Sequence, residues 1–284
     1  MMLMKRTFAK ILHGKPTLEG AGVHLKRGFG FYDTEDFDPF LLFDDFSNTE
    51  AEGYKAGFPQ HPHRGMETVT YLLKGEVVHR DNLGNAGSIG AGAVQWMSAG
   101  SGIVHEEMPQ VHAEGIQGFQ LWVNLPQIAK MSAPQYQDIR PEEIPTVASE
   151  GSEVKVIAGE YQGVKGPVSD ISVHPTYFDI TLVAEREFSF SLPAVHTLFI
   201  YVIEGDVVCQ SLNGEQWVRA GDIGLMSLGD EFEVYAGNNG ARFLLVSGAP
   251  LNEPIAWGGP IVMNTEAELK EAFAELQNGT FVKN

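Results

Sequence analysis

The stretch HPHRGMETVTYLLKGEVVHRD, residues 61–81, decides the fold of this chain. After its first histidines it holds two runs of strand-forming residues, 68–73 and 77–80, on either side of a Lys74-Gly75 turn. Similar runs follow at 93–97, 103–108 and 119–125, again separated by turns that contain glycine. Many short strands at this spacing predict an all-β protein built as an antiparallel sandwich or barrel.

Two clusters in these strand regions, His61-Pro62-His63 and His105-Glu106-Glu107, carry metal-binding side chains. Alternate side chains of a strand share a face, so His61 and His63 point the same way, as do His105 and Glu107. Four ligands from two strands can therefore converge on one ion. Imidazole and carboxylate ligands without a thiolate suit iron, nickel, copper, cobalt, manganese or zinc, and disfavour a structural zinc site of the cysteine type. We expect an open metal centre.

The identity of the carboxylate ligand is left open by spacing. Glu67 shares strand parity with His61 and His63, so it is also expected to face the interior. Either Glu67 or Glu107 can be the ligand, with the other orienting an imidazole. Glu106 and Glu107 are neighbours in a strand and face opposite ways, which excludes them as a catalytic carboxylate pair.

The remaining histidines and the single cysteine are interpreted as structural or surface residues. His79 and His112 have no paired ligand and are expected on the surface or in loops, while His174 and His196 are taken as structural. Cys209 follows Val207-Val208 and is expected to be a small buried apolar residue rather than a reactive thiol.

The second half of the chain repeats the first. Residues 71–78, YLLKGEVV, resemble residues 201–208, YVIEGDVV, and Met97-Ser98-Ala99-Gly100 resembles Met226-Ser227-Leu228-Gly229. At these offsets the positions of the four candidate ligands are occupied by Ser191, Pro193, Val234 and Ala236. The second copy therefore keeps the scaffold and lacks the ligands.

The pattern predicts four regions. Residues 1–130 are expected to form a first barrel with the metal site, 131–152 a proline-rich linker, 153–250 a second barrel, and 251–284 a tail with one helix. The helix is expected from about 265 to 277, because Thr265 and Glu268 form a capping box and Gly279 can end it.

Composition excludes several classes of protein. A net charge of −18 would repel a phosphate backbone, so we expect no direct binding of nucleic acid. No run of about twenty apolar residues is present to span a bilayer, and basic residues interrupt the apolar N-terminal segment. A single cysteine fits a reducing compartment, so the chain is expected to be cytoplasmic. It is also expected to be a monomer that does not associate with a membrane.

The strings HPHRGMETVTYLLKGEVVHRD (61–81), QWMSAGSGIVHEEMP (95–109) and QLWVNLP (120–126) resemble the pirin family of the cupin superfamily. The resemblance extends from about Phe37 to Thr265, which is most of the chain. It implies a bicupin of two antiparallel β-barrels, each a double-stranded β-helix, with a short C-terminal helix. It also implies one metal ion, most often Fe(II), held by His61, His63, His105 and Glu107, and so favours Glu107 over Glu67, although the general cupin pattern uses the earlier glutamate.

The resemblance implies a dioxygenase that opens flavonols such as quercetin with O2 and releases CO. Glu107 would be the catalytic base that accepts the flavonol hydroxyl proton. Apolar residues are available to line a pocket for a flat aromatic substrate, among them Phe58, Met66, Trp96, Ile103, Leu121 and Trp122.

Two other functions compete with this one. The first is an iron-dependent, redox-responsive regulator that binds a partner protein, either a transcription factor or a metabolic enzyme. The second and weaker is a sugar-phosphate isomerase, which would need basic residues such as Arg64 and Arg80 at the pocket mouth.

Overall fold

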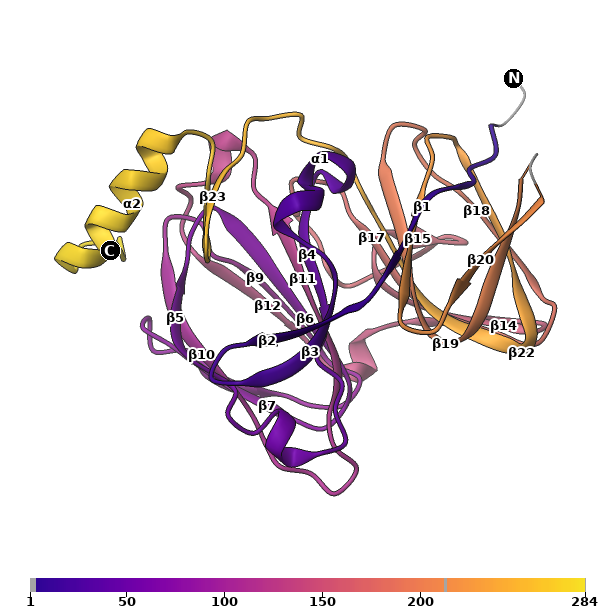
Figure 1. Ribbon diagram of the computed structural model, residues 1–284, viewed down its shortest axis with the longest axis horizontal. Helices are drawn as coiled ribbons and strands as arrows, with labels where there is room; N and C mark the ends of the chain where they lie inside the picture. The colour runs from indigo at the N-terminus through magenta and orange to yellow at the C-terminus, as the bar shows by residue number, and fades with distance from the viewer. Residues whose placement is uncertain (1–3, 212–213, 284) are drawn as a thin grey trace. The chain divides into compact units, whose positions relative to one another are not determined.

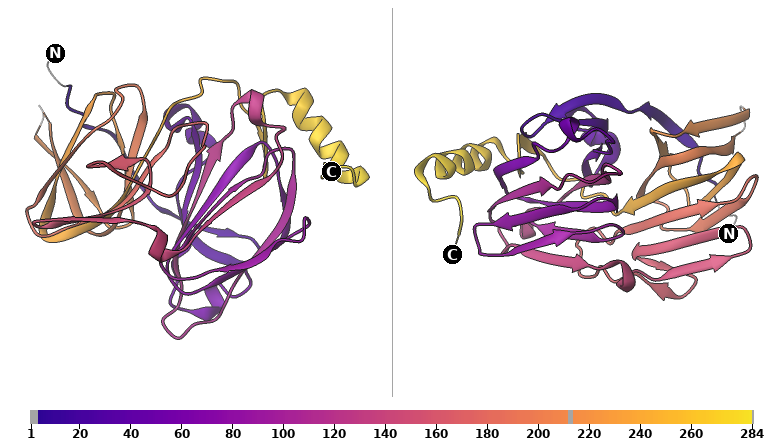
Figure 2. Two further views of the ribbon diagram at one scale, coloured as in Figure 1. Left: turned by 180° about the vertical axis from the view of Figure 1, so that it is seen from behind. Right: turned by 90° about the horizontal axis from the view of Figure 1, so that it is seen from below.

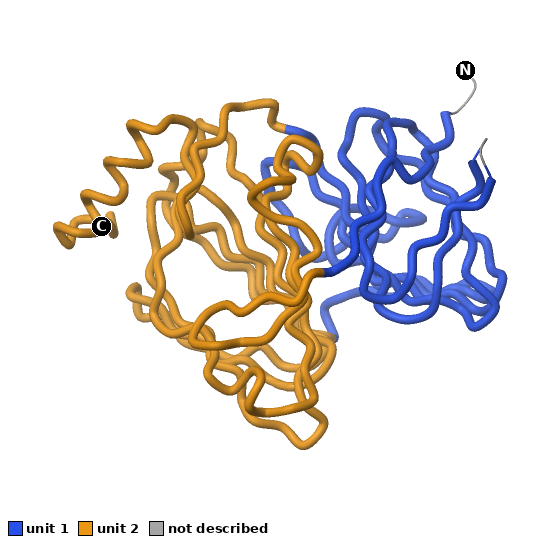
Figure 3. Tube along the Cα trace, in the orientation of Figure 1, with its two compact units in different colours: residues 1–14, 142–250 blue, residues 15–141, 251–284 orange. Residues whose placement is uncertain are grey.

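The structure, a computed structural model, describes residues 4–211 and 214–283. It divides into two compact units, unit 1 of residues 1–14 and 142–250 and unit 2 of residues 15–141 and 251–284 (Figure 3). Both units are built almost entirely from antiparallel strands (Figure 1), which confirms the all-β, two-cupin fold. Among the described residues, no helix is both long and apolar enough to span a bilayer.

Unit 2 is a sandwich of two open sheets. Within the described residues its larger sheet has seven strands, in the order β12 (Gln135–Ile139), β9 (Val94–Ser98), β6 (Met66–Lys74), β11 (Gln117–Asn124), β4 (Phe40–Asp45), β3 (Val23–Phe29) and β2 (Lys15–Glu19). The smaller sheet, counted over the same residues, has four, in the order β5 (Phe58–His63), β10 (Ile103–Pro109), β7 (Val77–Asp81) and β8 (Ala86–Ile89). Neither sheet closes on itself, so the expected barrel is a jelly-roll sandwich.

Unit 1 is also built on an open sheet. Among the described residues, its main path runs β1 (Phe8–His13), β21 (Asp222–Met226), β19 (Thr197–Ser211), β22 (Glu231–Gly248), β17 (Thr176–Leu182), β14 (Ser152–Ala158) and β13 (Thr146–Ser149). Two more strands join off this path, β18 (Glu187–Ser191) on β22 and β20 (Gly214–Arg219) on β19. Cys209 is buried in its apolar core, as predicted.

Short elements complete the chain. They are two strand pairs, four 3-10 turns and two helices among the described residues: β15 (Glu160–Tyr161) with β16 (Val164–Lys165), β23 (Ala256–Gly258) with β24 (Ile261–Met263), η1 (Phe31–Asp33), η2 (Ala51–Gly53), η3 (Gln127–Ala129), η4 (Pro141–Glu143), α1 (Thr34–Phe37) and α2 (Glu266–Asn278). Thr265 and Glu268 form the predicted capping box of α2, and Gly279 ends the helix at φ 72°.

The two compact units divide the chain differently from the boundaries drawn on the sequence. Strand β1 pairs with β21 and so covers an edge that would otherwise be exposed, which places residues 1–14 in unit 1. The segment 131–152 is not only a linker, because it supplies β12 and β13 to the two units' sheets. The tail 251–284 belongs to unit 2, where α2 (yellow in Figure 2) packs on β23 and β24.

The internal repeat is visible in the backbone. Gly75 and Gly205 occupy equivalent places and both take positive φ, 86° and 71°. In unit 1 the positions equivalent to two of the candidate ligands, Val234 and Ala236, are buried in the apolar core. Unit 1 therefore has the scaffold without the ligands, as expected.

Candidate metal centre

Strands β5 and β10 bring the two histidine clusters together. They pair antiparallel, with His105 opposite His61 and Ile103 opposite His63, so the three imidazoles share one face of the smaller sheet. A register shift follows between His105 and Glu107, and Glu107 lies opposite Phe58. The predicted convergence of the three histidines is therefore a direct result of strand register.

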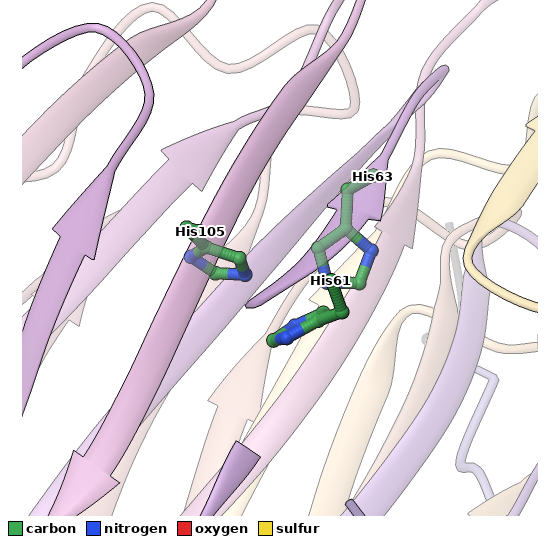
Figure 4. A group of neighbouring side chains, drawn as sticks. All are labelled: His61, His63 and His105. Atoms are coloured by element: carbon green, nitrogen blue, oxygen red, sulfur yellow. The ribbon is translucent and has the colours of Figure 1, made fainter. Parts of the chain in front are cut away.

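The three imidazoles form a compact triangle (Figure 4). Ring centroids are 4.8 Å apart for His61 and His63, 4.5 Å for His61 and His105, and 5.1 Å for His63 and His105. One nitrogen of each ring lies within 4.8 Å of the corresponding nitrogens of the other two. Among the residues that the structure describes, this is the one group of histidine, cysteine or acidic side chains close enough to hold a metal ion.

The hydrogen bonds and charge states of the histidines suit metal binding. His61 Nδ1 donates to the Pro59 carbonyl at 2.9 Å, which leaves Nε2 as the free donor atom. His63 and His105 are buried, and neither His63 Nδ1 nor either nitrogen of His105 makes a hydrogen bond. Burial, with the neighbouring imidazoles, lowers the pKa of His63 well below its usual value and that of His105 to about 3. Buried, neutral imidazoles that keep a nitrogen without a hydrogen bond are what a metal ion requires.

Glu107 lies beside this triangle rather than within it. Its buried carboxylate faces Thr70, whose Oγ1 lies 3.1 Å from Glu107 Oε1 and 2.9 Å from Gln120 Oε1. Burial raises the pKa of Glu107, and the neighbouring His61 opposes this effect. Glu106 faces the other way and pairs with Arg80 at 3.2 Å, as strand alternation predicts. Glu107 is therefore near the histidines but is not a member of the described group that could hold a metal ion.

Glu67 lies on the opposite face of the larger sheet. Thr70 is paired with Gln95 of β9 and Gln120 of β11, so these three side chains share the face toward Glu107. Glu67, three residues before Thr70, points the other way and accepts a hydrogen bond from Trp96 Nε1 at 3.0 Å. The parity with His61 and His63 does not hold, because a turn at Gly65, with φ 74°, interrupts the alternation between β5 and β6. The expectation that Glu67 faces the site was therefore wrong.

The buried position of Glu67 leads to a prediction about pH. Burial raises the pKa of Glu67 to about 7, from 4.5 for a free side chain. Between these values the folded chain binds more protons than the unfolded chain, so this group makes stability fall as pH rises. We expect Glu67→Gln to remove that fall and to stabilise the protein by roughly 1 to 3 kcal/mol at pH 8. Urea unfolding at pH 8 and pH 4 tests this prediction, and the variant should be no more stable than the parent at pH 4. A variant less stable than the parent at pH 8 would refute it.

His79 was assigned to the surface and is in fact buried. It lies on β7 opposite Glu107 and has the same strand parity as buried Val77. Gln95 Nε2 donates to His79 Nε2 at 2.9 Å and to Asp138 Oδ1 at 2.8 Å, so this histidine is held by a network behind the site. The alternation with exposed Arg80 is the signal that could have identified it. His112 is exposed, as expected.

A cavity of about 580 Å³ opens beside the histidines. His61, His63 and Glu107 line it, together with Phe58 and Trp122. The other four residues proposed from the sequence as pocket lining are buried elsewhere: Met66, Trp96, Ile103 and Leu121. Sequence reasoning missed several polar and C-terminal residues that do line the cavity: Glu19, Arg27, Asp44, Gln120, Trp257 and Pro260.

Arg64, next to His63, ties the site to the C-terminal tail. Its buried guanidinium donates to the carbonyls of Ser101 (Nε, 2.7 Å) and Phe281 (Nη2, 2.5 Å) and pairs with Glu275 at 2.7 Å. The Arg64 guanidinium also lies 4.1 Å from the centroid of the Phe281 ring. Because the Ser101 turn precedes His105, one side chain joins both histidine strands to the tail that supplies Trp257 and Pro260 to the cavity.

Replacing Arg64 is therefore expected to be costly. Arg64→Met keeps the apolar stem but leaves two carbonyls without their donor and, among the described residues, Glu275 with only its ion pair to Lys283. We expect the free energy of unfolding to fall by roughly 2 to 4 kcal/mol. Denaturant unfolding measures this. Arg80→Met is the matched control, because the Arg80 side chain is 66% exposed, and its ion pair with Glu106 should contribute less than about 1 kcal/mol. Equal losses in the two variants would contradict the role given to Arg64.

Comparison with known proteins identifies the family. Residues 22–123 match the family model for pirin, and residues 177–282 match that for the pirin C-terminal cupin domain. A pirin-like protein of Caulobacter vibrioides is 44% identical over 97% of this chain and 99% of its own length. Human pirin is 41% identical over 92% of this chain and 88% of its own length. The crystal structure of a quercetin 2,3-dioxygenase from Acinetobacter baumannii has a TM-score of 0.88 at 36% identity, covering 98% of this chain and 99% of the other. The fold, the histidine triangle and these matches together place this chain in the pirin family.

Proposed function

We propose that this protein is a mononuclear metal-dependent dioxygenase that opens flavonols such as quercetin with O2 and releases CO. The observation that carries the proposal is a triangle of three imidazoles, two of which line a cavity together with Glu107. The similarity to a solved quercetin 2,3-dioxygenase supports the substrate class.

The donor set fits a divalent metal. Three imidazoles are close together, and the unpaired buried nitrogens of His63 and His105 have no other role in the fold. His61, His63, His105 and Glu107 would hold the ion. When bound, Fe(II) or another redox-capable divalent metal supplies a Lewis-acidic, redox-active centre with exchangeable positions.

The chain's own residues would bind and deprotonate the substrate. Trp122 and Phe58 offer aromatic faces to a flat ligand, and Trp257 closes the cavity from the tail. Glu107 would accept the flavonol hydroxyl proton at a carboxylate oxygen, because its burial raises its proton affinity. Thr70 holds Oε1 of that carboxylate in place.

The structure gives no support to a sugar-phosphate isomerase. Arg64 is buried and bonded to Ser101, Phe281 and Glu275, and Arg80 pairs with Glu106 on the far side of β10. Neither arginine lines the cavity. Arg27 does line the cavity, but its guanidinium is paired with Asp44 and Glu19, so no arginine or lysine among the described lining residues is free to hold a phosphate.

Oxygen uptake tests the proposal. Full-length protein loaded with Fe(II) should consume one O2 and release one CO for each quercetin lost, and metal-free protein should not. Quercetin-dependent uptake no faster than that of the metal-free protein, with the metal content verified, would refute it.

A further inference from the structure

The wall of the cavity formed by the larger sheet carries a group of three charged side chains. Arg27 of β3 binds Asp44 of β4 through two hydrogen bonds, Nε to Oδ1 at 2.9 Å and Nη2 to Oδ2 at 2.8 Å. Its remaining nitrogen, Nη1, lies 2.9 Å from Glu19 Oε1 at the end of β2. All three residues line the cavity, and we call them the acidic wall.

The acidic wall and the histidines border the same cavity. Ala21, two residues after Glu19, donates its backbone N–H to the Gly57 carbonyl at 3.0 Å, just before β5 begins. The contact is tight, because a Cβ on Gly20 would lie 2.5 Å from that same carbonyl oxygen and Gly20 has φ 57°. His63, whose Nδ1 makes no hydrogen bond, also lines the cavity, so the acidic wall belongs to a site that already indicates a ligand.

The charges of the acidic wall favour one kind of ligand group. Every guanidinium nitrogen of Arg27 is engaged by a carboxylate, and the three side chains together carry one net negative charge. A carboxylate, sulfate or phosphate on a ligand would meet two carboxylates with no free cation. A hydroxyl would instead find acceptors, because carboxylate oxygens accept more than one hydrogen bond. The Glu19 side chain is 42% exposed and so is open to a ligand.

Gln120 adds a further polar group between the acidic wall and the surroundings of Glu107. It lies on β11 between the acidic wall and the Thr70 hydroxyl, and it also lines the cavity. Leu25, Leu42 and Trp122 line the same wall of the sheet and provide apolar contact for rings. This side of the cavity thus combines apolar side chains with the hydrogen-bond acceptors of the acidic wall and Gln120.

We propose that the acidic wall, Glu19, Arg27 and Asp44, selects polyphenols that present neutral hydroxyl groups to it, and rejects ligands that present an anionic group to it. This inference rests on the proposed function and narrows its substrate class. Among flavonols, it predicts a preference for those with free hydroxyls in addition to the 3-hydroxyl group.

Binding without turnover tests the inference separately from the reaction. Full-length protein loaded with Zn(II), which has no redox chemistry, is titrated under argon with three flavonols and followed by flavonol absorbance. The three are quercetin, 3-hydroxyflavone, which lacks the other four hydroxyls of quercetin, and 4′-carboxy-3-hydroxyflavone. We expect quercetin to bind about 10-fold more tightly than 3-hydroxyflavone, and the carboxylate to bind most weakly.

Glu19→Gln is the decisive variant, since the residue is partly exposed and its replacement should not disturb folding. It should weaken quercetin binding about 5- to 10-fold, tighten binding of the carboxylate, and leave 3-hydroxyflavone within about twofold. Glu114→Gln, the same change at an exposed residue outside the cavity, is the control and should alter none of the three.

The outcomes separate the two proposals. Equal affinity of the parent for all three flavonols, or an equal effect of Glu19→Gln on quercetin and 3-hydroxyflavone, would overturn the selection by the acidic wall and leave the proposed function standing. If none of the three binds the metal-loaded protein, both the proposed function and this inference fail.

Discussion

His105→Ala should abolish tight metal binding. His105 is 1% exposed, and its two nitrogens have no hydrogen-bond partner in the fold, so its imidazole is available to a metal alone. Changing the outer hydrogen-bond partners of a metal ligand typically lowers affinity 10- to 100-fold, so losing the ligand itself should cost at least about 100-fold. Metal content after gel filtration, together with competition against a chelator, measures the effect.

The stability of the same variant shows whether the loss of metal is due to the missing ligand or to unfolding of the protein. Removing two unpaired buried nitrogens offsets part of the cost of the space that alanine leaves, so metal-free His105→Ala should unfold within about 1 to 2 kcal/mol of the metal-free parent. Saturating metal should stabilise the parent by roughly 3 kcal/mol at 100 times its Kd and leave the variant unchanged. His24→Ala, at an exposed position of β3, is the control and should retain metal. A His105→Ala protein that keeps its metal would contradict the site.

Glu107→Gln should lower kcat for a flavonol by about 10²- to 10⁴-fold, the usual contribution of a general base. The amide keeps the shape of the side chain and its contact with Thr70 but cannot take up a proton. The metal content of the variant shows whether Glu107 is also a ligand, because replacing a carboxylate ligand with an amide should lower the affinity for the metal as well.

Glu67→Gln is the matched control for that experiment. Both glutamates are buried, and burial raises the pKa of each, yet only Glu107 lies on the cavity side of the sheets. We expect Glu67→Gln to keep kcat within about threefold, since Gln can still accept the hydrogen bond from Trp96. Similar losses in the two variants would show that the assignment by sheet face is incorrect.

The sequence by itself determined the features that depend on local periodicity. Alternation with a period of two placed His61 with His63 and His105 with Glu107, and it separated Glu106 from Glu107. Thr265, Glu268 and Gly279 fixed both ends of α2, because capping acts over a single turn. The similarity of residues 71–78 to residues 201–208 correctly indicated a second cupin unit without the metal ligands.

Only the tertiary structure decided which distant segments meet. Strand alternation predicted the wrong face for Glu67, because the turn at Gly65 interrupts it. A residue with positive φ changes the side of the sheet to which the following side chains point. Three contacts join residues that share no periodicity in the sequence. They are the pairing of β1 with β21, the binding of the tail to Arg64, and the contacts of Arg27 with Glu19 and Asp44 in the cavity that the histidines line. Such contacts arise from strand order and the packing of whole sheets, and these are set by burial across the chain rather than by any local pattern.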